Sequence, residues 1–163
     1  AVNHGVSYIL VDLPKLPMDM PFQNKAQELA SGTRPYWVKV TSSSVLEARS
    51  AMMQGSEKLC LFRFVETVSE LKDDGIGEVT ITQVREYKQL PDENGNVGPV
   101  TYAVYRQDPN NKDQYYVHDE GVISASSIPV APVYANRTAF YLGRPPMMEL
   151  AELNCAHWHK TLT

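Results

Sequence analysis

The stretch CAHWHK near the carboxyl end carries the side chains best suited to bind a transition metal. Cys155, His157 and His159 offer a thiolate and two imidazoles close together in the sequence. On a helix, however, Cys155 and His159 share one face at spacing i, i+4, whereas His157 points well away from it. No second cluster supplies the remaining ligands, so we expect no metal site here. A half-buried helix anchored by Trp158 explains the stretch better.

The segment PDENGNVGPVTYA resembles a calcium-binding loop in its first half only. Asp92, Asn94 and Asn96 occupy alternate positions, as calcium ligands do. Val97 stands where such a loop needs a glycine for its sharp turn, and Ala103 where a bidentate glutamate closes the site. We therefore interpret the segment as a hairpin loop.

Motifs of phosphate binding and nucleophilic catalysis are incomplete as well. The strand YILVD ends in Asp12, as magnesium-binding strands of P-loop NTPases do, but the chain contains no G-x-x-x-x-G-K-[ST] loop. We therefore interpret Asp12 as structural. The hydroxyls of TSSSV (Thr41–Val45) lie outside any G-x-S-x-G motif. The sequence thus predicts no catalytic, cofactor-binding or metal-binding residue and favours a non-enzymatic protein.

The composition is that of an ordinary globular chain. Its 163 residues suffice for one domain with a sizeable core, and they are 43% hydrophobic and 21% charged. The net charge of −4 comes from interspersed acids and bases, which argues against an autonomous nucleic-acid-binding face. No apolar run is long enough to span a membrane, so we expect no membrane contact. Cys60 and Cys155 are expected to be reduced, partly buried thiols rather than a disulfide.

Both ends of the sequence suggest a piece of a longer protein. The first residue is Ala1 rather than methionine, and no signal peptide follows it. The helical pattern at the other end runs to Thr163 without a terminator. We therefore expect a chain cut from a longer protein, with its last helix truncated.

The first third of the chain predicts strands on either side of a proline-rich loop. Val6–Leu13 is apolar, partly β-branched and followed by a proline, which favours a buried strand, and Gly5 suits the end of a preceding helix. Gln23–Ala30 predicts a short helix. Tyr36–Val40 alternates as a strand does. Val45–Met53 stays ambiguous between a helix and one arm of a hairpin.

The middle of the chain predicts an antiparallel meander. The alternating segments KLCLFRFVETV, EVTITQVREYK, VTYAVYRQ and QYYVH are separated by turn signals at Gly75, PDENGNVGP and DPNNKD. In the first of them we expect Leu59 and Leu61 on one face, with Cys60 and Phe62 on the other. A meander with short helices at its margins is an α+β architecture. We expect a single domain with three regions: a strand and short helix (1–34), a β-rich body (35–127), and an edge strand, elbow and connecting helix (128–163).

The last of these regions combines prolines, a polar turn and a helix. Ile128–Tyr134 is apolar but interrupted by Pro129 and Pro132, which favours an edge or bulged strand. Pro145 and Pro146 suit the first turn of a helix, where their missing N–H groups cost nothing. An apolar stripe then follows at helical spacing: Met147, Leu150, Ala151, Asn154 and Trp158, with Leu153 at its margin.

The same region resembles a known family. Ile128–Trp158 is similar to a family of tailed-phage and prophage proteins, catalogued as a domain of unknown function and related to phage portal proteins. There a strand of the form IPxVPVYxNRT leads into a helix start of the form GxPPLLDLAELNxAHW. GVSYILVDLP and RPYWVKVTSSSVLEAR resemble two further blocks, although VLEAR lacks the Asn-Trp typical of the second. The matching positions of the main block are Ile128, Pro129, Pro132, Val133, Tyr134, Asn136, Arg137, Thr138, Gly143, Pro145, Pro146, Leu150, Ala151, Glu152, Leu153, Asn154, Ala156, His157 and Trp158.

The resemblance implies a place in an assembly. A portal, or head-tail connector, is a ring of subunits at one capsid vertex through which DNA is packaged and ejected. Its subunits have an outer α/β wing, stem helices that line a DNA tunnel, and a clip that meets adaptor proteins. This chain would be wing-like, and its last helix would run on into the central body.

The implied partners are further copies of the subunit in a homo-oligomeric ring, together with capsid, scaffold or adaptor proteins. DNA would be contacted mainly by other parts of the subunit. The implied location is the virion, assembled in the host cytoplasm.

Within this interpretation, NRTAFYLGRPP is expected to form a rigid elbow. Arg137 and Arg144 could each hold a carboxylate, of their own or of an adjacent subunit, through two parallel hydrogen bonds. The alternative is that both are solvated loop residues. Two other functions stay open, a free-standing β-rich binding module and a hydrolase with scattered catalytic residues. The candidate assembly residues are Asn136, Arg137, Gly143, Arg144, Pro145, Pro146, Asn154 and Trp158.

Overall fold

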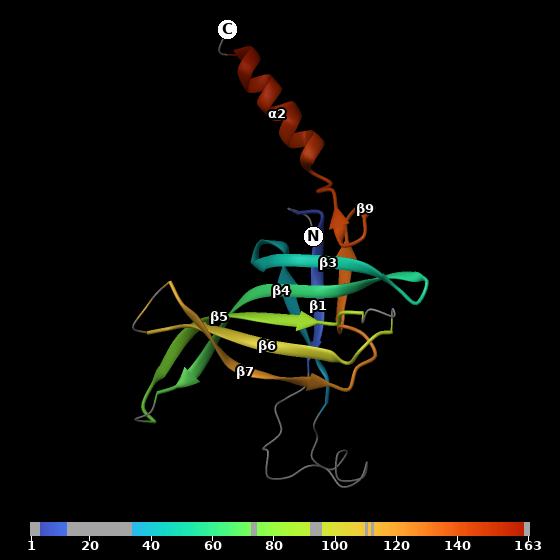
Figure 1. The fold of residues 1–163 in the computed structure, drawn as a ribbon. Coiled ribbons are helices and arrows are strands. Elements are labelled where there is room, and N and C mark those ends of the chain that lie inside the picture. The colour runs from blue at the N-terminus through green and yellow to red at the C-terminus, as the bar shows by residue number, and fades with distance from the viewer. Residues whose placement is uncertain are drawn as a thin grey trace.

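The computed structural model describes residues 4–12, 34–72, 75–91, 96–109, 111 and 113–161. These residues form three antiparallel sheets, a 3-10 turn (η1, Ser42–Ser44) and one α-helix (Figure 1). The chain is therefore mostly antiparallel sheet with a little helix, and the expected α+β class holds only loosely. The predicted helix Gln23–Ala30 lies outside the described residues.

The larger sheet is the predicted meander. Each strand pairs antiparallel with the next one along the chain, so spatial order and chain order coincide. The ambiguous segment 45–53 is an arm of a hairpin, because it pairs with the strand that follows the turn at Gln54 and Gly55. The strands are β3 (Val45–Met53), β4 (Ser56–Leu71), β5 (Glu78–Lys88), β6 (Val100–Gln107) and β7 (Tyr115–Ile123).

A smaller sheet joins segments from the two ends of the chain. It has the order β2 (Tyr36–Thr41), β1 (Val6–Asp12) and β8 (Val130–Tyr134), with β1 in the centre and both pairings antiparallel. The prediction that Ile128–Tyr134 contains an edge strand is confirmed. In Figure 1, β1 runs across the strands of the larger sheet. A third sheet is the short hairpin of β9 (Arg137–Ala139) and β10 (Leu142–Gly143), which precedes α2 (Met148–Thr161).

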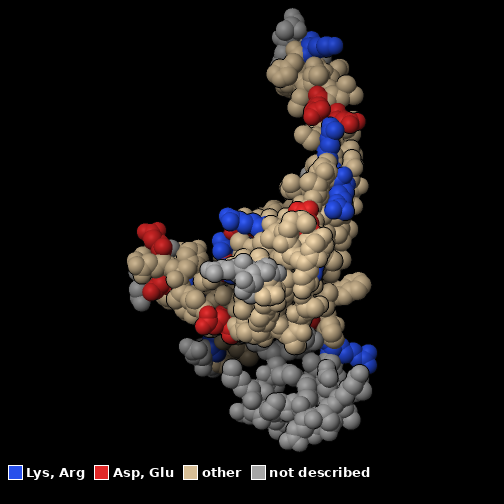
Figure 2. Space-filling view, turned by 45° about the vertical axis from the view of Figure 1, so that its right-hand side comes forward, with Lys and Arg blue, Asp and Glu red and all other residues tan. Residues whose placement is uncertain are grey.

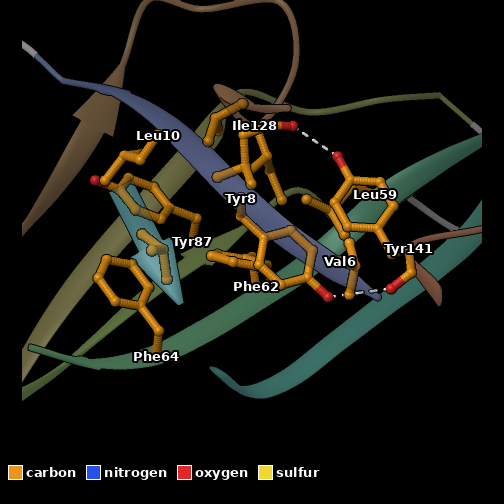
Figure 3. Close-up of a cluster of buried hydrophobic side chains, with 12 residues drawn as sticks. Val6, Tyr8, Leu10, Leu59, Phe62, Phe64, Tyr87, Ile128 and Tyr141 are labelled. Carbon is orange, nitrogen blue, oxygen red and sulfur yellow. Dashed lines mark hydrogen bonds between the residues drawn. The ribbon is translucent and has the colours of Figure 1, made fainter. Parts of the chain in front are cut away.

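The core fills the space between the two main sheets. Tyr8 of β1 lies at its centre, with its ring edge on the ring of Phe62 at 5.3 Å between centroids and stacked on Tyr141 at 5.8 Å. Phe62, Phe64 and Leu10 are almost completely buried. Figure 3 shows these side chains meeting from strands far apart in the sequence. The two sheets are thus held by apolar contact that neither could make alone.

A β-bulge at Cys60 decides which side chains of β4 face this core. Arg49 pairs with Leu61 and Ser50 with Leu59, so Cys60 is an extra residue on β4. Leu59 therefore joins the main core with Phe62, whereas Cys60 and Leu61 join a second cluster. The predicted faces are wrong at this point, because a bulge interrupts the alternation of a strand.

Charged side chains also connect the sheets. Arg85 of β5 donates to Asp12 of β1 at 2.6 Å and pairs with Glu66 of β4 at 2.8 Å. Burial alone would lower the pKa of Arg85, but Tyr87, Glu66 and Asp12 around it raise the pKa above its ordinary value. Asp12 thus has a partner within the fold, in keeping with the structural role we assigned to it.

Candidate functional site: the elbow and the projecting helix

The elbow between β8 and α2 rests on a close approach of two glycine backbones. Gly5, just before β1, has φ +77°, and a Cβ added there would collide with the carbonyl of Gly143. A Cβ added at Gly143 would likewise collide with the carbonyl of Gly5. Only glycine fits at these two positions. Both lack space for a side chain, and Gly5 also has a backbone conformation that favours glycine. The helix expected before Gly5 would lie in residues that the structure does not describe.

Backbone hydrogen bonds hold this approach on both sides. The N–H of Ala135 donates to the carbonyl of Gly5 at 2.9 Å, and the N–H of Arg144 donates to the carbonyl of Asn136 at 2.8 Å. The candidate residues Asn136, Gly143 and Arg144 therefore do come together, but through their main chains.

Hydrogen bonds among three tyrosines fix the elbow to the core. The main chain of Tyr141 donates to the hydroxyl of Tyr134 at 2.8 Å and accepts from the hydroxyl of Tyr8 at 3.0 Å. The side-chain hydroxyl of Tyr141 donates to the carbonyl of Val130 at 2.6 Å. These bonds hold Tyr141 at φ +57°, a conformation that costs free energy for an aromatic residue. Burial, and then the nearby Tyr134 and Tyr8, raise the pKa of Tyr141 to about 12.

The two arginines of the elbow have local partners. The guanidinium carbon of Arg137 lies 5.4 Å from the ring centre of Tyr134, a cation–π arrangement. Arg144 pairs with Glu149 of α2 at 3.6 Å, and both side chains are largely exposed. An exposed pair of this kind contributes little to stability, so both guanidinium groups stand near the surface where a second carboxylate could reach them.

The prolines lie just before the helix rather than within it. Pro145 and Pro146 form a turn in which the N–H of Met148 donates to the carbonyl of Pro145 at 3.2 Å. The N–H of Ala151 donates to the carbonyl of Met147 at 3.0 Å, which begins the regular helical pattern. The prolines thus lead the chain into α2, as their missing N–H groups allow.

The helix itself stands away from both sheets. It projects beyond β9 from one end of the body (Figure 1), and every residue from Met147 to Lys160 is exposed. Leu150 is 56% and Trp158 64% exposed, and Asn154 is exposed between them. The prediction of a half-buried helix anchored by Trp158 is therefore wrong for the described residues, since helical periodicity shows that a stripe exists but not what covers it. The expectation that Cys155 is partly buried is wrong for the same reason, whereas Cys60 is buried.

The surface of α2 divides into two faces. At 100° per residue the stripe from Met147 through Ala151 to Trp158 occupies one side, and Glu152 and Ala156 occupy the other. In Figure 2 the projecting helix carries a few charged side chains with uncharged surface between them.

Among the described residues, no group of three metal-ligating side chains exists on this helix or elsewhere. No described helix is both long and apolar enough to cross a bilayer.

A buried carboxylate on the outer face of the larger sheet is the strongest candidate for acid–base chemistry. Glu86, only 2% exposed, borders a hollow of about 540 Å³. Burial would raise its pKa, but hydrogen bonds from Lys88 and Arg63 outweigh burial and lower the pKa. Lys88 lies at 2.8 Å and the Arg63 Nε at 2.7 Å. Glu86 is therefore held ionised in ion pairs on the sheet, which is the arrangement of a structural carboxylate rather than of a proton donor.

Sequence reasoning missed the residues on which the elbow depends. Gly5 and Tyr141 act through contacts with segments more than a hundred residues away, and Tyr134 acts through a hydrogen bond that forms only when Tyr141 has a positive φ, so none of them leaves a local pattern. Comparison with models of known protein families gives no match to this chain, and comparison with curated proteins gives none either.

Proposed function

We propose that this chain is the wing-like domain of a phage portal subunit, a structural part of the ring through which DNA is packaged and ejected. The observation that carries the proposal is the exposed apolar stripe of α2. The sequence resemblance at Ile128–Trp158 indicates which assembly we propose, a phage portal. The role is non-enzymatic, and the elbow and α2 are the parts that join the domain to the rest of the ring.

The stability of α2 supports a partner outside the β body. A helix of 14 residues is marginal by itself in water. Most helices gain stability by burying an apolar face, and a fully buried leucine or similar side chain contributes about 1.5–3 kcal/mol. Leu150 and Trp158 would add such contributions if the central body of the subunit or a neighbouring copy covered the stripe.

The elbow supports the same role by fixing the direction in which α2 leaves the body. Gly5 and Gly143 are in backbone contact, and Tyr141 is held at three points, so the hairpin before the helix has little freedom. A connector between a wing and a ring needs this stiffness. The net charge of −4 fits a domain that leaves DNA contact to other parts of the subunit.

A matched pair of helix variants in the complete portal subunit tests the proposal. Ala151→Glu places a carboxylate on the stripe, whereas Ala156→Glu places the same group on the opposite face. We expect the parent subunit and Ala156→Glu to form closed rings by electron microscopy and sedimentation, and Ala151→Glu to lose them. The 163-residue chain alone is expected to stay monomeric, because it lacks the stem surfaces of a ring.

Both substitutions have the same effect on helix propensity, so a difference between them reports contact with a partner. Rings that tolerate Ala151→Glu as well as Ala156→Glu would contradict the role given to α2. A complete gene product that remains monomeric would contradict the portal assignment itself.

A further inference from the structure

A second hollow, which shares Tyr141 with the elbow, lies where the two main sheets meet. Its volume is about 680 Å³, within the range of ordinary ligand sites. Its floor is the edge of the core, where Leu59, Ile128 and Tyr141 lie close together in Figure 3. Its rim comes from Gln54 in the β3–β4 turn, from Lys58 of β4, and from the segments 97–99 and 125–127.

Gln89 places an unused hydrogen-bond acceptor in the wall of this cavity. The side chain is 3% exposed, and its Nε2 donates to the carbonyls of Gly98 at 3.0 Å and Ser126 at 3.1 Å. These two bonds use both amide hydrogens and thereby fix which side of the amide carries the oxygen. Among the described residues, Oε1 of Gln89 is the one buried side-chain nitrogen or oxygen atom without a hydrogen-bond partner. A buried acceptor of this kind is costly unless something donates to it.

Two residues with positive φ line the same cavity. Gln54 at φ +52° and Tyr141 at φ +57° are the non-glycine residues with positive φ in the described chain, and both line the cavity. The positive φ of Gln54 belongs to the two-residue turn between β3 and β4, and that of Tyr141 belongs to the elbow, so both features shape the cavity wall. Gln54 accepts a hydrogen bond from Nζ of Lys58 at 3.1 Å, which holds the ammonium group at the rim.

We propose that this cavity binds the carboxyl-terminal residue of a polypeptide chain that ends in an apolar side chain. The backbone N–H of that residue donates to Oε1 of Gln89, and its carboxylate pairs with Lys58. Its side chain contacts the apolar floor of Leu59, Ile128 and Val130. The inference needs no portal ring and stands apart from the function proposed for α2.

The chemistry of the wall selects this ligand over other small molecules. An acceptor deep in the wall requires an N–H or O–H donor, an ammonium at the rim favours an anion, and the floor between them favours a hydrocarbon group. A terminal amino-acid residue presents all three in that order, and capture of a terminal carboxylate is a recurring mode of peptide recognition. Because Oε1 is buried, the cavity wall must open locally before a donor can reach it.

Peptide titration of the 163-residue chain, followed by amide chemical shifts, tests the proposal. The probe is acetyl-Gly-Ser-Gly-Leu with a free carboxylate. We expect saturable shifts in the segments 97–99 and 125–128 and in the side-chain amide of Gln89. The same peptide with an amidated end, and an ester analogue that lacks only the leucine N–H, are each expected to bind at least fivefold more weakly.

The ester analogue examines the bond to Gln89 without changing the protein, so the result does not depend on the folding of a variant. Lys58→Met is expected to weaken the free peptide at least fivefold while leaving the amidated peptide unchanged. Lys39→Met, an exposed position on β2, is the matched control and is expected to change neither affinity.

Three results would each overturn the proposal. The first is the lack of any saturable shift, and the second is equal affinity for the ester analogue and for the parent peptide with its leucine N–H. The third is a set of shifts confined to other surfaces. A long-lived water on Oε1 of Gln89 that the peptide does not displace would also overturn it.

Discussion

The β body and α2 are folded by different means, although one elbow joins them. In the body, two sheets cover each other around Tyr8 and Phe62, which are 4% and 0% exposed. In α2, Leu153 is 67% exposed and no described residue up to Lys160 is buried. The body is therefore stabilised by contacts among its own strands. The apolar face of α2 could be buried only by a surface outside the described part of the chain. The β body is thus a folding unit, whereas α2 presents an apolar stripe that the described part of the chain leaves uncovered.

The largest expected effect is a loss of stability from truncation in the core. Phe62→Ala removes a fully buried ring that contacts Tyr8 and Phe64, and should lower the free energy of unfolding by about 3–5 kcal/mol. Trp158→Ala in α2 should change it by less than about 0.5 kcal/mol, because the indole is largely exposed. Urea denaturation followed by near-ultraviolet circular dichroism measures both. Similar losses for the two variants would show that α2 packs on the body in solution.

A smaller effect is expected where the body meets the elbow. Gly5→Ala adds a Cβ that collides with the carbonyl of Gly143 and also strains a positive φ, so we expect a loss of about 3 kcal/mol. Gly55→Ala is the control, because Gly55 has the same φ of +77° but open space around the added Cβ. This variant should lose about 1 kcal/mol of unfolding free energy. Thermal and urea unfolding compare the two variants. Equal losses would mean that the Gly5–Gly143 approach is not tight.

Alkaline pH should destabilise the body through its buried tyrosines. Burial raises the pKa of Tyr141 to about 12, and burial, partly opposed by Arg85, raises that of Tyr87 to about 12. Above pH 10 the unfolded chain releases these protons while the folded chain keeps them, so stability falls as pH rises from about 10 to about 12. Each such tyrosine should lower the free energy of unfolding by about 1 kcal/mol at about pH 11.

Urea midpoints between pH 8 and 11 measure this dependence. Tyr141→Phe should reduce the fall of the urea midpoint with rising pH. Tyr115→Phe, at an exposed position, should leave that fall unchanged. A fall that is the same in both variants would contradict the assignment of the effect to Tyr141.

The smallest effect on the body is expected from a change confined to the helix. Ala156→Gly lowers helix propensity by about 1 kcal/mol within α2. We expect weaker far-ultraviolet helical signal and faster amide exchange in α2, with no shift in the unfolding midpoint of the β body. A shifted midpoint would show that helix and body unfold together.

The sequence was sufficient for the order of the larger sheet. Turn residues at Gly75 and around 108–113 separate alternating segments, and local pairing then follows chain order. Pro129 and Pro132 correctly indicated an edge strand. These features depend on a few neighbouring residues, which is why they could be predicted.

The features that were missed depend on distant contacts. The bulge at Cys60 appears only once β3 and β4 are paired, and Gly5 meets Gly143 only in the folded chain. The walls of the Gln89 cavity come from five separate stretches, so no local pattern marks it. The expected burial of Trp158 was wrong because an amphipathic stripe does not identify its partner. Arg137 and Arg144 were placed correctly in the elbow, but their role in assembly stays a prediction.

The contact of Gly5 with Gly143 has a mechanical consequence. Gly5 continues directly into β1, which is hydrogen-bonded on both sides by β2 and β8. A force applied along α2 therefore reaches the domain by two routes: through the chain into the edge strand β8, and through the Gly5–Gly143 contact into the central strand β1. The glycine contact thus lets β1 share a load that β8 would otherwise carry alone.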